Sequence, residues 1–118
     1  MPGGQPRNYP NTGSAVLLPL QLKNGTVESV EALVCGGAPK GSFTNANNGS
    51  FDGARDTCGR IKVSDPNPQW VMETMPLARV MGDMLLLLNG HVLIINGASA
   101  GVAGWELGRN PVLSLVKI

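Results

Sequence analysis

The feature that most constrains the fold of this chain is a pattern that occurs twice. Three short segments each recur: a Met-Pro pair followed by an arginine, an apolar run of four residues, and an apolar run that leads to a glycine. The paired segments are residues 1–7 and 75–79, 15–18 and 84–87, and 33–37 and 93–97. The spacing between copies varies, so loops of different length separate the shared segments. An internal repeat of this kind is typical of proteins built from copies of one structural unit.

The sequence between these landmarks predicts short strands separated by turns. The predicted strands are residues 13–20, 30–35, 59–64, 70–75, 82–88 and 91–96. Asn24-Gly25 and Asn89-Gly90 are strong hairpin-turn signals. Residues 1–11 and 38–57 are rich in Gly, Pro or small residues without any period, and they are expected to form loops. With 16 Gly and 9 Pro among 118 residues, long helices are disfavoured, and the predicted fold class is all-β.

The predicted strands fit the blades of a β-propeller, which have four strands each. Inner strands covered on both faces are continuously apolar rather than alternating, as are the runs LLLL and VLII. Residues 13–75 are predicted to form one full blade, and residues 82–118 an incomplete second blade. The order Pro-Gln-Trp, Met-Pro-x-x-Arg, strand, Asn-Gly, strand, glycine follows the kelch repeat. About one and a half blades cannot close a ring, so the chain is expected to be a fragment of a larger propeller.

Composition excludes several classes of partner. Charged residues make up 14% of the chain and the net charge is +1, without a basic stripe, so no nucleic-acid partner is expected. The apolar run of residues 84–88 is too short to cross a bilayer, so no membrane partner is expected. The first residues lack the apolar core of a signal peptide. The protein is therefore either cytosolic or its true N-terminus lies upstream.

Long blocks of the chain resemble the plant-type glyoxal oxidase (aldehyde oxidase) family, which is related to galactose oxidase. The blocks are GGQPRNYPNTGSAVLLPL, LVCGGAPKGSF, CGRIKVSDPNPQWVMETMPLARVMGDMLLL and NGHVLIINGASAGVAGWELGRNPVL. This resemblance implies a seven-bladed kelch propeller in an extracellular copper-radical oxidase. Such an enzyme converts an aldehyde, O2 and water to a carboxylic acid and H2O2. The resemblance also implies one copper ion, a tyrosine–cysteine radical cofactor, a second tyrosine and two histidines.

Little of that copper site carries over to this chain. The family's ligand segments lie outside the matching blocks, and the chain has one tyrosine and one histidine. Tyr9 is followed by Pro10, where the family's Arg-x-Tyr-His segment has its histidine. His91 flanks a hairpin turn and is expected at the surface. No catalytic, cofactor-binding or metal residue is assigned, and the chain alone is predicted to be inactive. Its expected partners are the missing blades and, for the whole enzyme, small aldehydes.

The two cysteines and two glycosylation sequons bear on the compartment. Cys35 ends one predicted strand and Cys58 begins the next, so antiparallel pairing brings them within reach of a disulfide. Free buried thiols are the alternative, and a zinc site lacks further ligands. Sequons at Asn24 and Asn48 lie in predicted loops and mark both as N-glycosylation sites. The sequons and the cysteine placement favour an extracellular location.

The remaining polar and aromatic candidates have structural interpretations. The two tryptophans, Trp70 and Trp105, are expected to pack rather than bind substrate. Three acidic residues are expected in turn or cap roles: Asp65, Asp83 and Glu106. Residues 97–101 are glycine-rich, but no helix is predicted after them, so nucleotide binding is disfavoured. The alternative function is a non-catalytic kelch-repeat module that binds proteins, which would have reduced cysteines in the cytosol.

Overall fold

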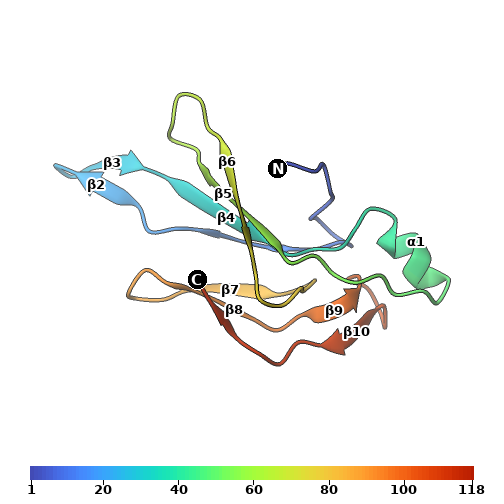
Figure 1. Ribbon diagram of the computed structural model, residues 1–118. Coiled ribbons are helices and arrows are strands. Elements are labelled where there is room, and N and C mark those ends of the chain that lie inside the picture. Colours follow the sequence, from blue (N-terminus) through green and yellow to red (C-terminus); the bar gives the residue numbers. More distant parts are fainter.

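Two antiparallel sheets make up most of the computed structural model, which describes residues 1–118 (Figure 1). Sheet 1 contains β1 (Ser14–Leu17), β4 (Glu31–Cys35), β5 (Thr57–Lys62) and β6 (Trp70–Thr74), in that spatial order. Sheet 2 contains β7 (Asp83–Leu86), β8 (Val92–Ile95) and β11 (Val116–Lys117), with β8 in the middle. The all-β class predicted from the sequence is confirmed. The seven-bladed ring stays a prediction, because this chain holds only two stacked sheets.

Three excursions leave these sheets. A hairpin of β2 (Gln21–Lys23) and β3 (Thr26–Ser29) lies between β1 and β4. Its turn is Asn24-Gly25, with φ of 53° and 78°, as the hairpin signal predicted. The helix α1 (Ser42–Asn47) lies between β4 and β5, and the hairpin of β9 (Ala98–Gly101) and β10 (Gly108–Pro111) lies between β8 and β11.

The structure has elements that were not predicted: strands β2, β3, β9, β10 and β11 lie outside the predicted strands, and α1 lies in a predicted loop. The prediction of a loop over residues 38–57 was wrong at α1, whose six residues are too few to show a helical period. The helix forms because Ser42 and Ala46 bury one face of it. The glycine-rich residues 97–101 contain strand β9, which packs mainly through alanines and therefore lacks the apolar pattern of a strand. No helix in the structure is long and apolar enough to cross a bilayer.

The internal repeat is preserved in the strand register. In sheet 1, β1 and β4 pair Ser14 with Cys35 and Leu17 with Ala32. In sheet 2, β7 and β8 pair Asp83 with Ile95 and Leu86 with Val92. These pairs occupy matching positions of the two repeat copies. The third strands also correspond, because β5 places Gly59 opposite Val34 and β11 places Val116 opposite Ile94. Sheet 2 therefore reproduces the first three strands of sheet 1.

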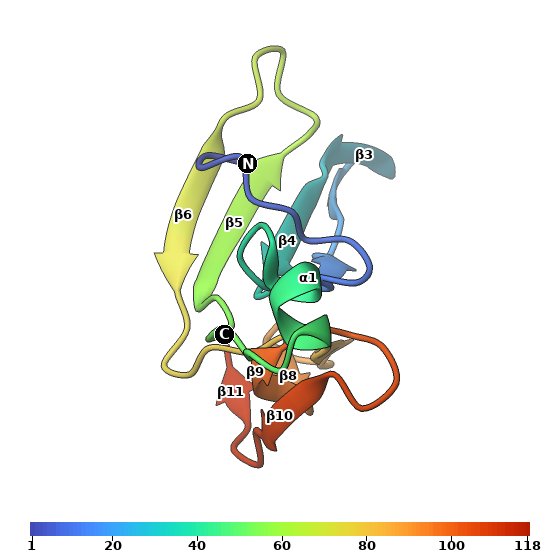
Figure 2. The ribbon, with the colours of Figure 1, turned by 90° about the vertical axis from the view of Figure 1, so that its right-hand side faces the viewer.

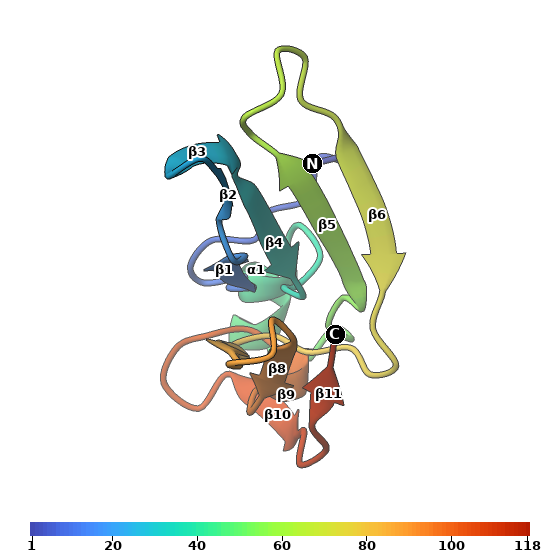
Figure 3. The same ribbon diagram turned by 90° about the vertical axis from the view of Figure 1, so that its left-hand side faces the viewer.

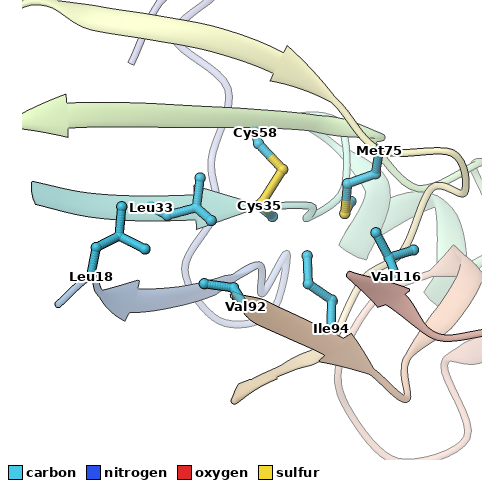
Figure 4. Packing of buried hydrophobic residues seen from close by; sticks show 8 residues of the cluster. All are labelled: Leu18, Leu33, Cys35, Cys58, Met75, Val92, Ile94 and Val116. Atoms are coloured by element: carbon cyan, nitrogen blue, oxygen red, sulfur yellow. A yellow bond between two sulfur atoms is a disulfide. The ribbon is translucent and has the colours of Figure 1, made fainter. Parts of the chain in front are cut away.

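The two sheets are stacked on each other (Figure 3), and the main hydrophobic core lies between them (Figure 4). Sheet 1 and the residues flanking it contribute one side of this core, and sheet 2 contributes the other. The buried members are Leu18, Leu33, Cys35, Cys58, Met75, Val92, Ile94 and Val116. Packing is expected here because both sheets present alternating apolar residues to each other. The two sheets thus depend on one another for burial of their apolar surface.

The two large excursions, α1 and the β9–β10 hairpin, lie side by side (Figure 2), and a second, smaller core joins them. It contains mostly small residues from α1, β9 and the segments beside them: Ala38, Ala46, Val80, Ala98 and Val102. Backbone hydrogen bonds run from Ala54 N to Ser99 O and from Gly101 N to Asp52 O, at 2.8 Å each. The excursions that follow the second strand of each sheet therefore pack against each other at one end of the molecule.

The face of each sheet that points away from the main core is apolar and poorly covered. On sheet 1 this outer face carries Leu17, which is 53% exposed, and its cross-strand partner Ala32. On sheet 2 it carries Leu85, which is 46% exposed, and its partner Leu93. The sequence analysis expected the inner strands to be covered on both faces. In this chain each sheet is covered on one face only.

Candidate functional site

The side chains of Arg7 and Arg79 each donate two hydrogen bonds to distant parts of the backbone. Arg7 Nη1 donates to Gly36 O at 2.8 Å and to Thr57 O at 3.0 Å, and its Nη2 donates to Thr57 Oγ1 at 2.7 Å. Arg79 Nη1 donates to Asn96 O at 3.0 Å, and its Nη2 donates to Ser114 O at 3.1 Å. We call these two guanidinium groups the arginine clamps.

The two clamps hold matching places in the two sheets. Gly36 and Asn96 follow the second strand of their sheets, β4 and β8, and are equivalent in the repeat. Thr57 begins β5, and Ser114 stands two residues before β11. Each clamp therefore ties the end of a second strand to the beginning of the third. Each closes the base of the excursion between those strands.

The clamps were not identified from the sequence, although both arginines are part of the repeated Met-Pro…Arg segment. Their chemistry depends on backbone carbonyls, which no side-chain motif reveals. Arg79 is 1% exposed and pairs with no carboxylate, so burial lowers its pKa. Burial, with a smaller effect from the neighbouring charge of Arg55, also lowers the pKa of Arg7. Each arginine donates to two backbone carbonyl oxygens in place of a carboxylate. Such hydrogen bonds offset part of the cost of burying a cation that has no acidic partner.

A surface hollow of about 520 Å³ lies beside the β9–β10 hairpin. Its lining consists of Met81, Gly97, Ala98, Gly108, Arg109, Asn110 and Pro111. Arg109 is the only charged side chain in that lining. Its guanidinium carbon stands 4.0 Å from the centre of the Phe51 ring, and Nη1 donates to Gly108 O at 2.8 Å. The lining of the hollow contains no His, Asp, Glu, Lys, Tyr or Cys side chain.

The structure does not bring Tyr9 and His91 together. Tyr9 is 71% exposed and lies beside the loop after β9, because Ala103 N donates to Pro10 O at 2.7 Å. His91 is exposed in the β7–β8 turn, where its backbone N donates to Asn89 Oδ1. That turn is at the opposite end of sheet 2 from β9. Each residue is at the surface, as the sequence analysis expected of His91.

The residues of this chain do not fit a copper-radical centre. Cys35 and Cys58 form a disulfide and are direct cross-strand partners on β4 and β5, which confirms the predicted bond. Neither sulfur is therefore available for a cross-link to Tyr9. His91 has no second ligand, and no group of three His, Cys, Asp or Glu side chains is placed to hold a metal ion. No step of copper chemistry can be derived from these residues.

The other polar and aromatic candidates take structural positions, with one correction. Asp83 Oδ2 accepts a hydrogen bond from Asn96 Nδ2 at 2.9 Å, and Asp65 lies 3.9 Å from Lys62 Nζ at an exposed turn. Trp70 is half-buried over Gly59. Trp105 was expected to pack, but it is 89% exposed on the turn before β10. Its neighbour Glu106 also lies exposed in that turn, with a φ of 57°.

Comparison with known proteins gives a consistent result. The sequence profile of the glyoxal oxidase N-terminus family matches residues 1–117. The chain is 47% identical over 108 residues to aldehyde oxidase GLOX of Vitis pseudoreticulata, covering 92% of this chain and 20% of that protein. It is 42% identical over 114 residues to aldehyde oxidase GLOX1 of Arabidopsis thaliana, covering 94% and 18%. It is also 40% identical to a WSC domain-containing protein of Arthroderma benhamiae over 93% of this chain and 11% of that protein.

The chain spans about a fifth of the length of the two plant relatives. No solved structure matches it. The family profile covers both sheets, both arginine clamps and all the excursions. The chain therefore belongs to the glyoxal oxidase N-terminus family.

Proposed function

We propose that residues 1–118 form two neighbouring blades of a kelch β-propeller in an extracellular copper-radical aldehyde oxidase. In that role sheet 1 is a complete blade and sheet 2 is the first three strands of the next. The whole enzyme would convert an aldehyde, O2 and H2O to a carboxylic acid and H2O2. The copper and its radical cofactor would be held by segments other than these residues, which contribute the scaffold. The observation that carries the proposal is the matching register of the two sheets.

The way the two sheets stack supports a ring. The residues of sheet 2 that face sheet 1 include Met84, Ile94 and Val116. Their repeat equivalents on sheet 1 are Ala15, Val34 and Gly59, all on its outer face. The outer face of sheet 1 is thus equivalent to the face by which sheet 2 packs on sheet 1. If the same packing recurs, that outer face packs on a preceding sheet in the same way. Repetition of one stacking step is what closes a propeller.

The two methionines of the repeat support the same arrangement. Met75 is buried between the sheets beside Val116 of β11 (Figure 4). Met1 lies over Gly59, where an added Cβ would come within 3.0 Å of its sulfur. Gly59 is the repeat equivalent of Val116. Met1 thus occupies, on the outer face of sheet 1, the place that Met75 occupies in the core.

The test compares this chain with the full-length protein that contains it, using glyoxal, copper and a peroxidase-coupled assay for H2O2. The full-length protein is expected to release peroxide, and the purified chain of residues 1–118 is expected to release none. Peroxide from the chain would show that its own residues carry the chemistry. A full-length protein that binds a protein partner but makes no peroxide would instead favour the non-catalytic kelch module. The buried disulfide counts against that module in a reducing cytosol.

Two substitutions in the full-length protein sharpen this test. His91→Ala removes the one histidine of these 118 residues, and Tyr9→Phe removes the hydroxyl of the one tyrosine. Histidine and tyrosine are the two residue types that the proposed copper site requires. Both side chains are at the surface, so both variants are expected to keep kcat and KM within about twofold of the parent protein, as surface changes cost little stability. Loss of peroxide production in either variant, with copper binding also lost, would assign that residue to the metal site.

A further inference from the structure

The structure assigns two N-linked glycans to this protein, one on Asn24 and one on Asn48. This inference concerns a covalent modification and does not depend on the oxidase activity. Both asparagines begin an Asn-Gly-Thr or Asn-Gly-Ser sequon. All six residues of the two sequons are exposed.

The amide groups of these two asparagines are free, whereas the amides of three other asparagines are engaged. Asn11 Nδ2 donates to Pro39 O at 2.8 Å, Asn45 Nδ2 to Asp52 Oδ2 at 2.9 Å, and Asn96 Nδ2 to Asp83 Oδ2 at 2.9 Å. No hydrogen bond within the protein involves the side-chain amide of Asn24 or Asn48. A glycan on either one therefore replaces only water and breaks no contact of the fold.

The positions of both asparagines leave space for a large polar group. Asn24 is the first turn residue of the β2–β3 hairpin, whose strands pair only with each other. Asn48 directly follows α1, and its backbone N donates to Thr44 O and Asn45 O. In Figure 1 the hairpin and α1 lie at opposite ends of the molecule, whose long dimension is 55 Å. Neither glycan would cover an outer face on which another sheet can stack.

The hairpin also presents a surface that a sugar would cover. Leu22 and Val27 are cross-strand partners, and they are 62% and 49% exposed. A hollow beside them is lined by Lys23, Asn24, Thr26, Val27 and Glu28. The sugar attached to Asn24 would lie next to this apolar pair, and the hydrophilic chain beyond it would shield the pair from other molecules.

The disulfide supplies an independent observation that points to the same modification. Cys35 and Cys58 are 1% and 0% exposed and bonded to each other. Structural disulfides form in oxidising compartments such as the lumen of the endoplasmic reticulum, where N-glycans are also attached. The co-reactant is a lipid-diphosphate-linked oligosaccharide. The Asn Nδ2 forms a bond to the first sugar's anomeric carbon, the bond from that carbon to the diphosphate breaks, the lipid diphosphate leaves and the amide loses one proton.

Tryptic mapping of the reduced and alkylated full-length protein, isolated from its natural source, tests the assignment at each site separately. Cleavage after lysine and arginine gives the peptides 24–40 and 41–55, which carry one sequon each. Where the glycan hinders cleavage after Lys23, the first is read as peptide 8–40. Peptide 8–23 contains Asn8 and Asn11 but no sequon, so it is the internal control.

Both sequon peptides are expected to carry sugar masses, and the control peptide none. Because Asn-Gly also deamidates spontaneously and takes up the same label when it does so in heavy-oxygen water, glycan release by amidase in that water is compared with an incubation that lacks the enzyme. A site whose peptide is found entirely without sugar overturns the assignment at that asparagine. The variants Thr26→Ala and Ser50→Ala destroy each sequon but keep its asparagine. Each variant is expected to lose one glycan and to keep its peroxide production unchanged. The glycosylation assignment and the proposed oxidase activity are therefore tested by separate measurements.

Discussion

Single arginine side chains hold the ends of strands together in this chain. Arg79 is almost fully buried, yet it has no acidic partner and relies on two carbonyl oxygens that lie 18 residues apart in sequence, on Asn96 and Ser114. Since a buried cation without hydrogen bonds is very costly, the carbonyls and the guanidinium must be kept together. The clamp is therefore a condition for closing the β9–β10 excursion.

Removal of this clamp should cost more than removal of an exposed ion pair. Arg79→Met keeps the apolar stem but leaves the partly buried carbonyls of Asn96 and Ser114 without this donor, so we expect a loss of about 1–3 kcal/mol in unfolding free energy. Arg60→Met is the matched control, because Arg60 forms a partly exposed pair with Glu73 at 3.0 Å, which is worth less than about 1 kcal/mol. Chemical denaturation measures both. Equal losses in the two variants would contradict the role of the clamp.

The disulfide is the other feature that belongs to the residue scale. Cys35 and Cys58 are 23 residues apart in sequence, and their bond constrains the unfolded chain, so breaking it should cost about 2–4 kcal/mol. Reductant is therefore expected to lower the thermal midpoint of the parent protein. The double variant Cys35→Ala/Cys58→Ala should start lower and show no response to reductant. Two thiols that react in the denatured, non-reduced protein would refute the bond.

At the scale of elements, the ends of the strands are fixed by close approaches of backbone to backbone. Gly36 directly follows β4 and has a φ of 73°, and a Cβ added there would fall on the carbonyl oxygen of Arg79. Gly37 N in turn donates to Arg79 O at 2.9 Å. The strand end of sheet 1 and the segment that enters sheet 2 thus meet without room for a side chain. This contact sets how one sheet is stacked on the next.

Alanine substitutions at two glycines separate the stability cost of a steric clash from the cost of a strained backbone. Gly36→Ala combines an unfavourable positive φ with the clash, so we expect a loss of about 3 kcal/mol. Gly90→Ala has a similar φ of 85°, but its nearest neighbouring atom would be 3.9 Å away, so only the strain of about 1 kcal/mol remains. Urea midpoints of the two variants give the comparison. A loss at Gly36 no greater than that at Gly90 would argue against close stacking of the sheets.

At the scale of the whole molecule, two sheets cover only one face of each other. The outer faces leave Leu17 and Leu85 about half exposed, and exposed apolar patches promote association. The isolated chain is therefore expected to self-associate. Leu17→Gln and Leu85→Gln should increase the monomer fraction in analytical ultracentrifugation, whereas Leu22→Gln, on the hairpin away from the sheets, should change it less. A monomeric parent chain at high concentration would contradict this account of the outer faces.

The sequence predicts the sheets better than it predicts what connects them. The strands of sheet 1, the two Asn-Gly turns and the disulfide follow from runs, turn residues and cysteine positions, all of which are local signals. The helix α1 and strand β9 were missed because they pack largely through alanines, and that packing exists only in three dimensions. Strands β2, β3, β10 and β11 were missed because they are short and mostly polar. The arginine clamps escaped for the same reason, since their partners are backbone atoms far along the chain. Trp105 shows that an aromatic side chain does not by itself establish burial.

The most direct test of the central claim is an experimental structure of the full-length protein with copper bound. We expect residues 1–118 to form two adjacent blades, another sheet to cover Leu17 and Ala32, and every copper ligand to come from outside these residues. A structure in which the two sheets close on each other as a separate sandwich with Leu17 still exposed, or in which Tyr9 or His91 binds the metal, would contradict it.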